Sequence, residues 1–151
     1  MSIELTKENH ESFLKLISSI MIKDIQFMEF HSRKTAPGAD LSQDEINISW
    51  KQDFADGDPL RHGENEILFR PKYEFSLSQS GKEFFHFKVI TTILFSLTDR
   101  NNYDNCWAIE SVRSFFLEKQ VMKTMWPILR QNLMDIMSRH SLTPIILPWI
   151  F

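Results

Sequence analysis

The chain has 151 residues, 42% of them hydrophobic and 25% charged, and its formal net charge is −3. This length and composition are typical of a single globular domain, and the charge predicts no broad basic surface for nucleic acid or for an anionic membrane. No apolar run approaches the ~18 residues that a membrane-spanning helix needs, and the N-terminal residues do not resemble a signal peptide. We expect a soluble, cytoplasmic protein that binds no nucleic acid and does not insert into membranes.

The sequence lacks the common motifs of catalysis and cofactor binding. Its one cysteine, Cys106, has no CxxC partner, and its five histidines are scattered without an HExxH pattern, so we predict no metal site. Only four glycines are present and no glycine-rich phosphate loop occurs, which predicts no nucleotide cofactor. Aromatic residues, by contrast, make up 13% of the chain, and this indicates either a large aromatic core or an apolar surface for partners.

The first part of the chain is predicted to form one helix and then two strands. Residues 6–17 follow the amphipathic pattern of a short helix, which we assign to an N-terminal extension of residues 1–19. Residues 20–30 carry apolar side chains on both sides of a strand, and residues 31–44 have the composition of a loop. Residues 46–54 alternate between apolar and polar, as a half-buried strand does.

Two longer strands are predicted next, over residues 68–78 and 84–97, and the turn residues Ser80-Gly81 join them as a hairpin. One face of the second strand is apolar, and its other face is partly apolar. A sheet with two apolar faces usually has both of them covered, so a second subunit is a candidate to cover the second face. Residues 99–105 are polar and are predicted to form a loop.

The C-terminal part of the chain changes to helical periodicity. Residues 109–125 predict one helix and residues 126–140 predict a second, with Pro127 in its first turn. Residues 141–151 contain two prolines and predict an extended, apolar segment. The expected fold is therefore α+β, with a four-stranded antiparallel sheet followed by two C-terminal helices.

Several motifs of this sequence resemble those of the SecB protein-export chaperone family. That family opens a long helix with an aromatic residue next to a proline, follows it with an arginine, and closes on an apolar segment that contains proline. Its first strand carries a K-D-I-S-F element. The corresponding residues here are Trp126-Pro127, Arg130, Leu147-Pro148 to Phe151 and, in the first strand, Ile22–Phe27. The likeness spans residues 20–151, which we assign to one SecB-like domain.

The resemblance implies an ATP-independent holdase that binds non-native polypeptides along apolar grooves and assembles as a dimer of dimers. It also implies docking to the translocase motor through acidic residues of the sheet. Asp24 matches one of these, whereas Met28 and Ser96 stand at two other acidic positions. Divergent SecB-like chaperones serve toxin–antitoxin systems instead, where the client is an aggregation-prone antitoxin. Export and antitoxin service both remain open at this point.

Client-binding residues are predicted among the aromatic and long apolar side chains that the helix and strand patterns do not obviously need for a core. They are Trp50, Phe54, Phe84, Trp126, Leu129, Met137 and Trp149. Two other classes of protein stay open, an oligomeric domain that binds a small apolar ligand and an enzyme that uses Cys106 with a histidine. Because no polar constellation lies among the aromatic residues, we prefer a holdase without enzymatic activity.

Overall fold

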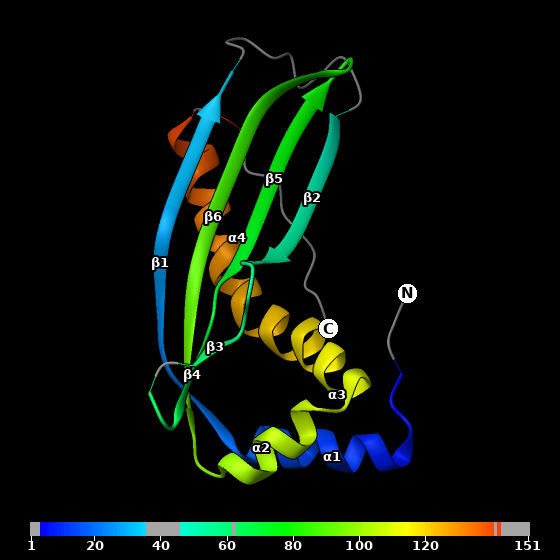
Figure 1. Cartoon of the computed structure of the whole chain (residues 1–151). Coiled ribbons are helices and arrows are strands. Elements are labelled where there is room, and N and C mark those ends of the chain that lie inside the picture. Colours follow the sequence, from blue (N-terminus) through cyan, green and yellow to red (C-terminus); the bar gives the residue numbers. More distant parts are fainter. Residues whose placement is uncertain (1–3, 36–45, 62, 141, 143–151) are drawn as a thin grey trace. The chain divides into compact units, whose positions relative to one another are not determined.

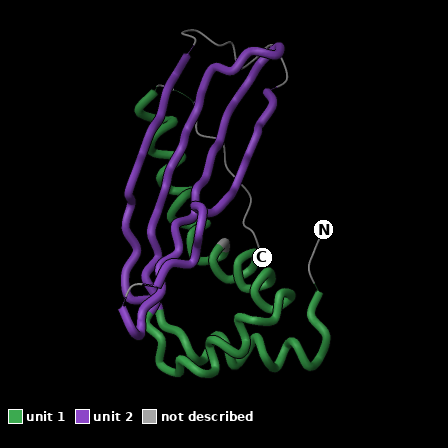
Figure 2. Tube along the Cα trace, in the orientation of Figure 1, with its two compact units in different colours: residues 1–21, 96–151 green, residues 22–95 purple. Residues whose placement is uncertain are grey.

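The structure is a computed structural model that describes residues 4–35, 46–61, 63–140 and 142. The chain divides into two compact units, residues 22–95 and residues 1–21 together with 96–151 (Figure 2). We call the first the sheet unit, because it consists of strands, and the second the helical unit, because it holds the helices (Figure 1).

The antiparallel sheet has six strands where four were predicted. One added strand lies between the strands predicted over residues 46–54 and 68–78, and the single strand predicted over residues 68–78 is divided in two. The strands are β1 (Ile20–Lys34), β2 (Ile46–Phe54), β3 (Leu60–Arg61), β4 (Glu66–Phe69), β5 (Pro71–Gln79) and β6 (Lys82–Leu97). Their order is β2-β5-β6-β4-β3, and β1 also pairs with β6. The predicted hairpin is β5 and β6, which pair antiparallel.

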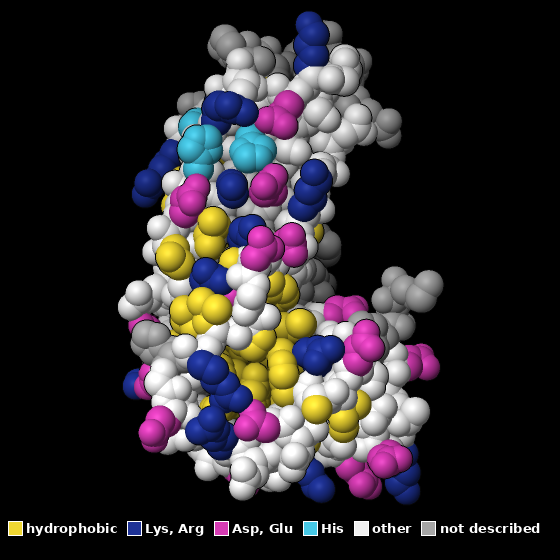
Figure 3. Space-filling model, viewed as in Figure 1, with side chains coloured by type: hydrophobic (Ala, Val, Ile, Leu, Met, Phe, Trp, Pro, Cys, Tyr) yellow, Lys and Arg dark blue, Asp and Glu magenta, His cyan; other side chains and the backbone are white. Residues whose placement is uncertain are grey.

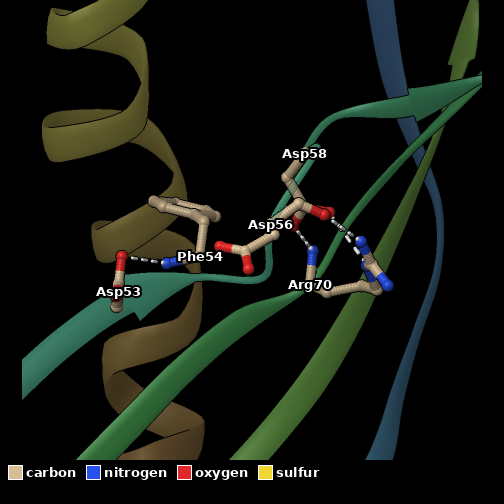
Figure 4. A network of polar contacts seen from close by, with 5 residues as sticks. All are labelled: Asp53, Phe54, Asp56, Asp58 and Arg70. Carbon is tan, nitrogen blue, oxygen red and sulfur yellow. Dashed lines mark hydrogen bonds and ion pairs between the residues drawn. The ribbon is translucent and has the colours of Figure 1, made fainter.

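A polar network around Arg70 separates β4 from β5 (Figure 4). The Arg70 Nε atom donates to Asp58 Oδ1 at 2.8 Å, and the Arg70 backbone N–H donates to the other oxygen of the same carboxylate. The Arg70 Nη2 atom donates to the Asp56 carbonyl at 2.9 Å. Because a side chain takes the backbone N–H of Arg70, that group does not join the strand ladder, and the strand is interrupted there.

Side chains alternate along β5 and β6, so that the sheet has an aromatic face and a polar face. In the register of this hairpin, Phe75 lies opposite Phe87 and Tyr73 lies opposite Val89. The buried side chains that these two strands place on the aromatic face are Tyr73, Phe75, Leu77, Phe85, Phe87, Val89, Ile93 and Phe95. Apolar burial on this scale is the main source of stability for the sheet unit.

Strand β1 continues to Lys34, beyond its predicted end near Phe30. The backbone N–H of Thr35 still donates to the Phe84 carbonyl at 3.0 Å, and the Thr35 hydroxyl donates to the Glu83 carbonyl at 2.7 Å. Backbone ladders do not depend on side-chain polarity, and so the polar residues after Phe30 extend the strand instead of forming the predicted loop.

The helix predicted near the N-terminus is α1 (Lys7–Ser18), and the Thr6 hydroxyl caps it by accepting from the Asn9 N–H at 3.2 Å. Its buried side chains are Phe13 and Leu16. Within the helical unit, the Phe13 ring meets the Phe115 ring edge-on at 4.8 Å between centroids. These contacts pack α1 against the helices that follow β6.

The polar loop predicted over residues 99–105 is wrong, because α2 (Arg100–Trp107) occupies this segment. Asp99 supplies the reason, since its carboxylate accepts from the Asn102 N–H at 3.1 Å and caps the helix. Tyr103 and Cys106, three residues apart, bury the same face of α2. The polar segment therefore becomes helical because the core buries this small apolar face.

The two predicted C-terminal helices are joined rather than separate. The segments α3 (Glu110–Phe115), a π-helical turn η1 (Phe116–Val121) and α4 (Met122–Arg139) follow one another without a loop. Pro127 therefore lies inside α4 and not in a first turn. The end of α4 at Arg139 agrees with the prediction, and the predicted extended segment falls largely outside the described residues. Within the described ranges, no helix is long and apolar enough to cross a membrane.

Candidate functional site

The aromatic face of the sheet continues across several strands as a series of ring contacts. Phe75 meets Phe85 with centroids 6.3 Å apart, and Phe30 of β1 meets Phe87 at 5.1 Å. Such edge-on pairs add stability beyond the area that they bury, of about 0.5–1.5 kcal/mol each. The result is a broad, buried apolar layer on one side of the sheet unit, built from long-range pairs that the sequence does not reveal.

Trp50 and Phe54 are the predicted client-binding residues that β2 places at one margin of this face. Trp50 lies 5.7 Å from the Tyr73 ring and 6.1 Å from the Phe75 ring, and Phe54 lies 6.3 Å from the Phe69 ring. Both side chains are half-buried. They are four positions apart along the strand, so they share one face and are spaced by about 13 Å. Because both side chains are partly exposed, a bound polypeptide can contact them without displacing the buried side chains.

The remaining predicted client-binding residues lie deeper. Phe84 of β6 is buried, and so are Trp126, Leu129 and Met137, which follow one stripe of α4. Trp149 lies outside the described residues. Among the described members of the predicted set, therefore, only Trp50 and Phe54 combine an aromatic contact with partial exposure.

Strand β1 carries a group of exposed apolar side chains that the prediction of client-binding residues did not include. They are Met21, Ile22, Phe27, Met28 and Phe30, with exposures between 42% and 63%. The signal in the sequence was the apolar pattern on both sides of this strand, because a strand apolar on both faces is typical of one that is covered on both. Among the described residues, β1 pairs only with β6, and so its apolar side chains lie along an edge of the sheet.

Asp24, the residue matched to translocase docking, is exposed on β1. Its carboxylate accepts a hydrogen bond from Gln26 Nε2 at 2.6 Å. Met28, which stands at a second acidic position of the family, is 63% exposed. The region around Asp24 is therefore more apolar than the resemblance implies.

Ionisable side chains give no sign of an activated group. Within the described part of the chain, no three His, Cys, Asp or Glu side chains gather closely enough to hold a metal ion. Burial raises the pKa of the Tyr73 hydroxyl well above its ordinary value. Burial also raises the pKa of the Cys106 thiol, although the positive charge of Lys15 lowers it in part. A nucleophilic cysteine needs the opposite shift.

Cys106 is expected to react slowly with a disulfide reagent while the protein is folded. Its side chain is 5% exposed, and a raised pKa leaves less thiolate at neutral pH. We expect the reaction at pH 7 to be at least about tenfold slower in buffer than in urea, as followed by absorbance of the released thiol. Equal rates in the two solvents would show that the thiol is accessible in the folded protein, and would support the hypothesis of an enzyme that uses Cys106.

No protein-family model and no curated protein sequence matches the chain. Among solved structures, it is similar to a SecB-like chaperone of Mycobacterium tuberculosis, determined in complex with a ChAD peptide from the HigA1 antitoxin. The two share 14% sequence identity with a TM-score of 0.69, over 95% of this chain and 99% of that one. A protein of unknown function from Streptococcus agalactiae has 9% identity and a TM-score of 0.38, over 85% of this chain and 96% of that one.

The similarity to the mycobacterial chaperone extends over nearly the whole chain, which agrees with the extent of the motifs found in the sequence. At 14% identity it is a likeness of fold. The α+β arrangement of antiparallel sheet and C-terminal helices is thus confirmed, and the chain has the SecB-like fold.

Proposed function

We propose that this protein is an ATP-independent chaperone that binds unfolded polypeptide and keeps it from aggregating. The observation that carries the proposal is the partly exposed margin of the aromatic face, where Trp50 and Phe54 are half-buried while the centre of the face is buried. Apolar side chains of an unfolded client fit such a surface without any need for a specific sequence. The similar mycobacterial chaperone was determined with a bound peptide, which supports a polypeptide as the ligand.

The energetics of such a holdase are modest. Burial of apolar surface contributes about 25 cal/mol per Å², and ordering of the bound chain offsets much of the gain. A single site therefore binds weakly and releases its client readily. Repeated sites in an oligomer raise the overall affinity through effective concentration, which suits a chaperone that works without ATP.

We also propose that the protein is a homo-oligomer, in the cytoplasm, and that β1 forms one of its interfaces. An exposed apolar edge strand is a ready template for pairing with another strand. In an antiparallel pair of β1 strands centred on Gln26, Ile22 lies opposite Phe30 and Ile25 lies opposite Phe27, so that apolar side chains meet across the pair. The further pairing of dimers into a dimer of dimers follows from the family resemblance.

Of the two services that the family performs, we favour antitoxin holding over export. Docking to the translocase motor needs an acidic patch, and β1 offers Asp24 beside an exposed Met28. The antitoxin peptide bound by the mycobacterial chaperone supports the same choice. An aggregation-prone antitoxin is therefore the client class that we propose, while unfolded export substrates are the alternative.

The proposal predicts that the protein suppresses aggregation without nucleotide. A chemically unfolded, slow-folding protein diluted into buffer should scatter less light as this chain is added, and the effect should saturate near stoichiometric amounts. Phe54→Ala should weaken suppression by several-fold, because one half-buried aromatic anchor contributes about 1–2 kcal/mol. The control is Leu14→Ala, which removes an apolar side chain 53% exposed on α1.

Full suppression by wild-type protein and weaker suppression by Phe54→Ala would support both the function and the site. Suppression that Phe54→Ala leaves unchanged would contradict the site alone. A folded, oligomeric protein that suppresses nothing would contradict the holdase function, and binding of a small apolar ligand would become the leading hypothesis.

A further inference from the structure

The polar face of the sheet unit contains a hollow of about 510 Å³ at the strands β2, β5 and β6. Its walls include three lysines, Lys51, Lys72 and Lys88, one from each strand. The register sets Lys51 opposite Glu74 and Glu74 opposite Lys88, so these side chains stand in one cross-strand row. The hairpin of β5 and β6 and the neighbouring strand β2 thus bring their lysines to one place.

Two acidic side chains, Glu74 and Asp53, share this hollow, and each also contacts a group other than the three lysines. Glu74 Oε2 lies 3.7 Å from His86 Nε2, and Asp53 Oδ1 accepts from the Phe54 N–H at 2.8 Å. Among the described residues, none of the three lysines has a carboxylate within ion-pair distance. The hollow therefore holds three lysines and two carboxylates, an excess of positive charge on a chain whose net charge is −3.

A second hollow, of about 450 Å³, lies on the same face and is mainly apolar. Its apolar side chains are Met28, Leu60, Leu68 and Leu94. Leu60 lies opposite Leu68 in the pairing of β3 with β4. The bonds from Arg70 to Asp58 and to the Asp56 carbonyl (Figure 4) hold the loop before β3, which keeps Leu60 in this position.

The two hollows form one strip along β6. Lys88, Ile90, Thr92 and Leu94 are alternate residues of this strand, so they share the polar face. From Lys88 to Leu94 the strip is about 20 Å long, the length of some six extended residues. Figure 3 views this face and shows a band of charged side chains over the sheet, next to a group of hydrophobic ones.

We propose that this strip, the polar-face strip, binds an extended segment of a partner protein that has apolar side chains followed by acidic ones. The apolar side chains would enter the hollow at Leu60 and Leu94, and the carboxylates would meet Lys72 and Lys88. Carboxylates supply the charge that the lysines lack, and the apolar end fixes the direction of the segment. The inference goes beyond the proposed function, because it uses the lysines and leucines of the polar face and needs no unfolded client. The two sites meet at Trp50, which also borders the lysine hollow.

The test measures binding of two labelled peptides by fluorescence anisotropy. One has about ten residues with leucines before aspartates and glutamates, and the other has lysines in place of the acidic residues. We expect the acidic peptide to bind at least about tenfold more tightly, and salt at about 0.5 M to reduce this preference, because screening weakens the lysine contacts. Equal binding of the two peptides would overturn the proposal.

Variants then locate the site and separate it from the client site. Lys72→Glu/Lys88→Glu and, separately, Leu60→Ser should each weaken binding of the acidic peptide by about tenfold or more. The matched control is Lys82→Glu, an exposed lysine near one end of β6, which should have no such effect. If Lys72→Glu/Lys88→Glu folds normally by circular dichroism and still binds the acidic peptide, the proposal is wrong.

The client assay distinguishes failure of this proposal from failure of the proposed function. Phe54→Ala should weaken aggregation suppression and leave peptide binding unchanged, while Lys72→Glu/Lys88→Glu should do the reverse. Loss of peptide binding in Phe54→Ala, or competition between peptide and unfolded client for one site, would show that the polar-face strip is not a separate site and would overturn the inference.

Discussion

Asp58→Ala is expected to lower the free energy of unfolding by about 2–4 kcal/mol, because it removes one partner from a nearly buried ion pair. The Asp58 side chain is 3% exposed, and its carboxylate accepts from both the guanidinium and the backbone N–H of Arg70. Without it, the guanidinium, itself 26% exposed, loses its carboxylate. The loop that carries Leu60 loses its anchor at the same time.

Urea unfolding followed by circular dichroism measures this effect, with Asp56→Ala as the matched control. Asp56 is exposed and contributes only its backbone carbonyl to Arg70, so its side chain should matter by less than about 0.5 kcal/mol. An equal loss in the free energy of unfolding for the two variants would show that the Asp58 carboxylate has no special role, and that any change in this loop destabilises the fold.

Phe27→Lys is expected to separate the proposed dimer into single chains. Phe27 is 44% exposed on β1, and burial of one phenylalanine contributes about 1.5–3 kcal/mol. Less than half of the Phe27 side chain is left to bury, but a two-fold interface contains it twice, so the dimer dissociation constant should rise by about tenfold or more. The added lysines also lie near one another across the pair, and charge on an edge strand opposes pairing.

Light scattering during gel filtration gives the mass of the assembly, in multiples of the 17.9 kDa chain. Leu14→Lys is the control, because Leu14 is similarly exposed but lies on α1. A mass that falls for both variants would indicate general damage. A mass that stays unchanged for Phe27→Lys at every concentration would remove β1 from the proposed interface.

Regular alternation in the sequence was sufficient to predict the central strands. The strand predicted over residues 46–54 is β2 with the same bounds, and the hairpin of β5 and β6 forms where Ser80-Gly81 indicated a turn. Period-two patterns are sufficient here because alternate side chains of a strand point to opposite faces of the sheet, one buried and one more exposed. The helical period of about 3.6 residues, which is equally local, predicted α1 and the end of α4.

Local rules failed where the backbone is held by groups distant in sequence. The helix α2 forms in a polar segment, because Tyr103 and Cys106 find a core to enter. The break at Arg70 depends on Asp58, twelve residues earlier. The continuation of the helical segment through Pro127 likewise contradicts the usual cost of proline inside a helix.

The candidate sites too could be predicted from the sequence only in part. Aromatic content, alternation and the family motifs were readable along the chain, and they sufficed for the SecB-like fold and for Trp50 and Phe54 as candidates. The apolar pattern of β1 was readable, but its place at an edge of the sheet and the meeting of Lys51, Lys72 and Lys88 were not, because each depends on which strands become neighbours. Strand pairing and register are set by contacts across the whole sheet. They determine which side chains lie together at a surface and which lie apart.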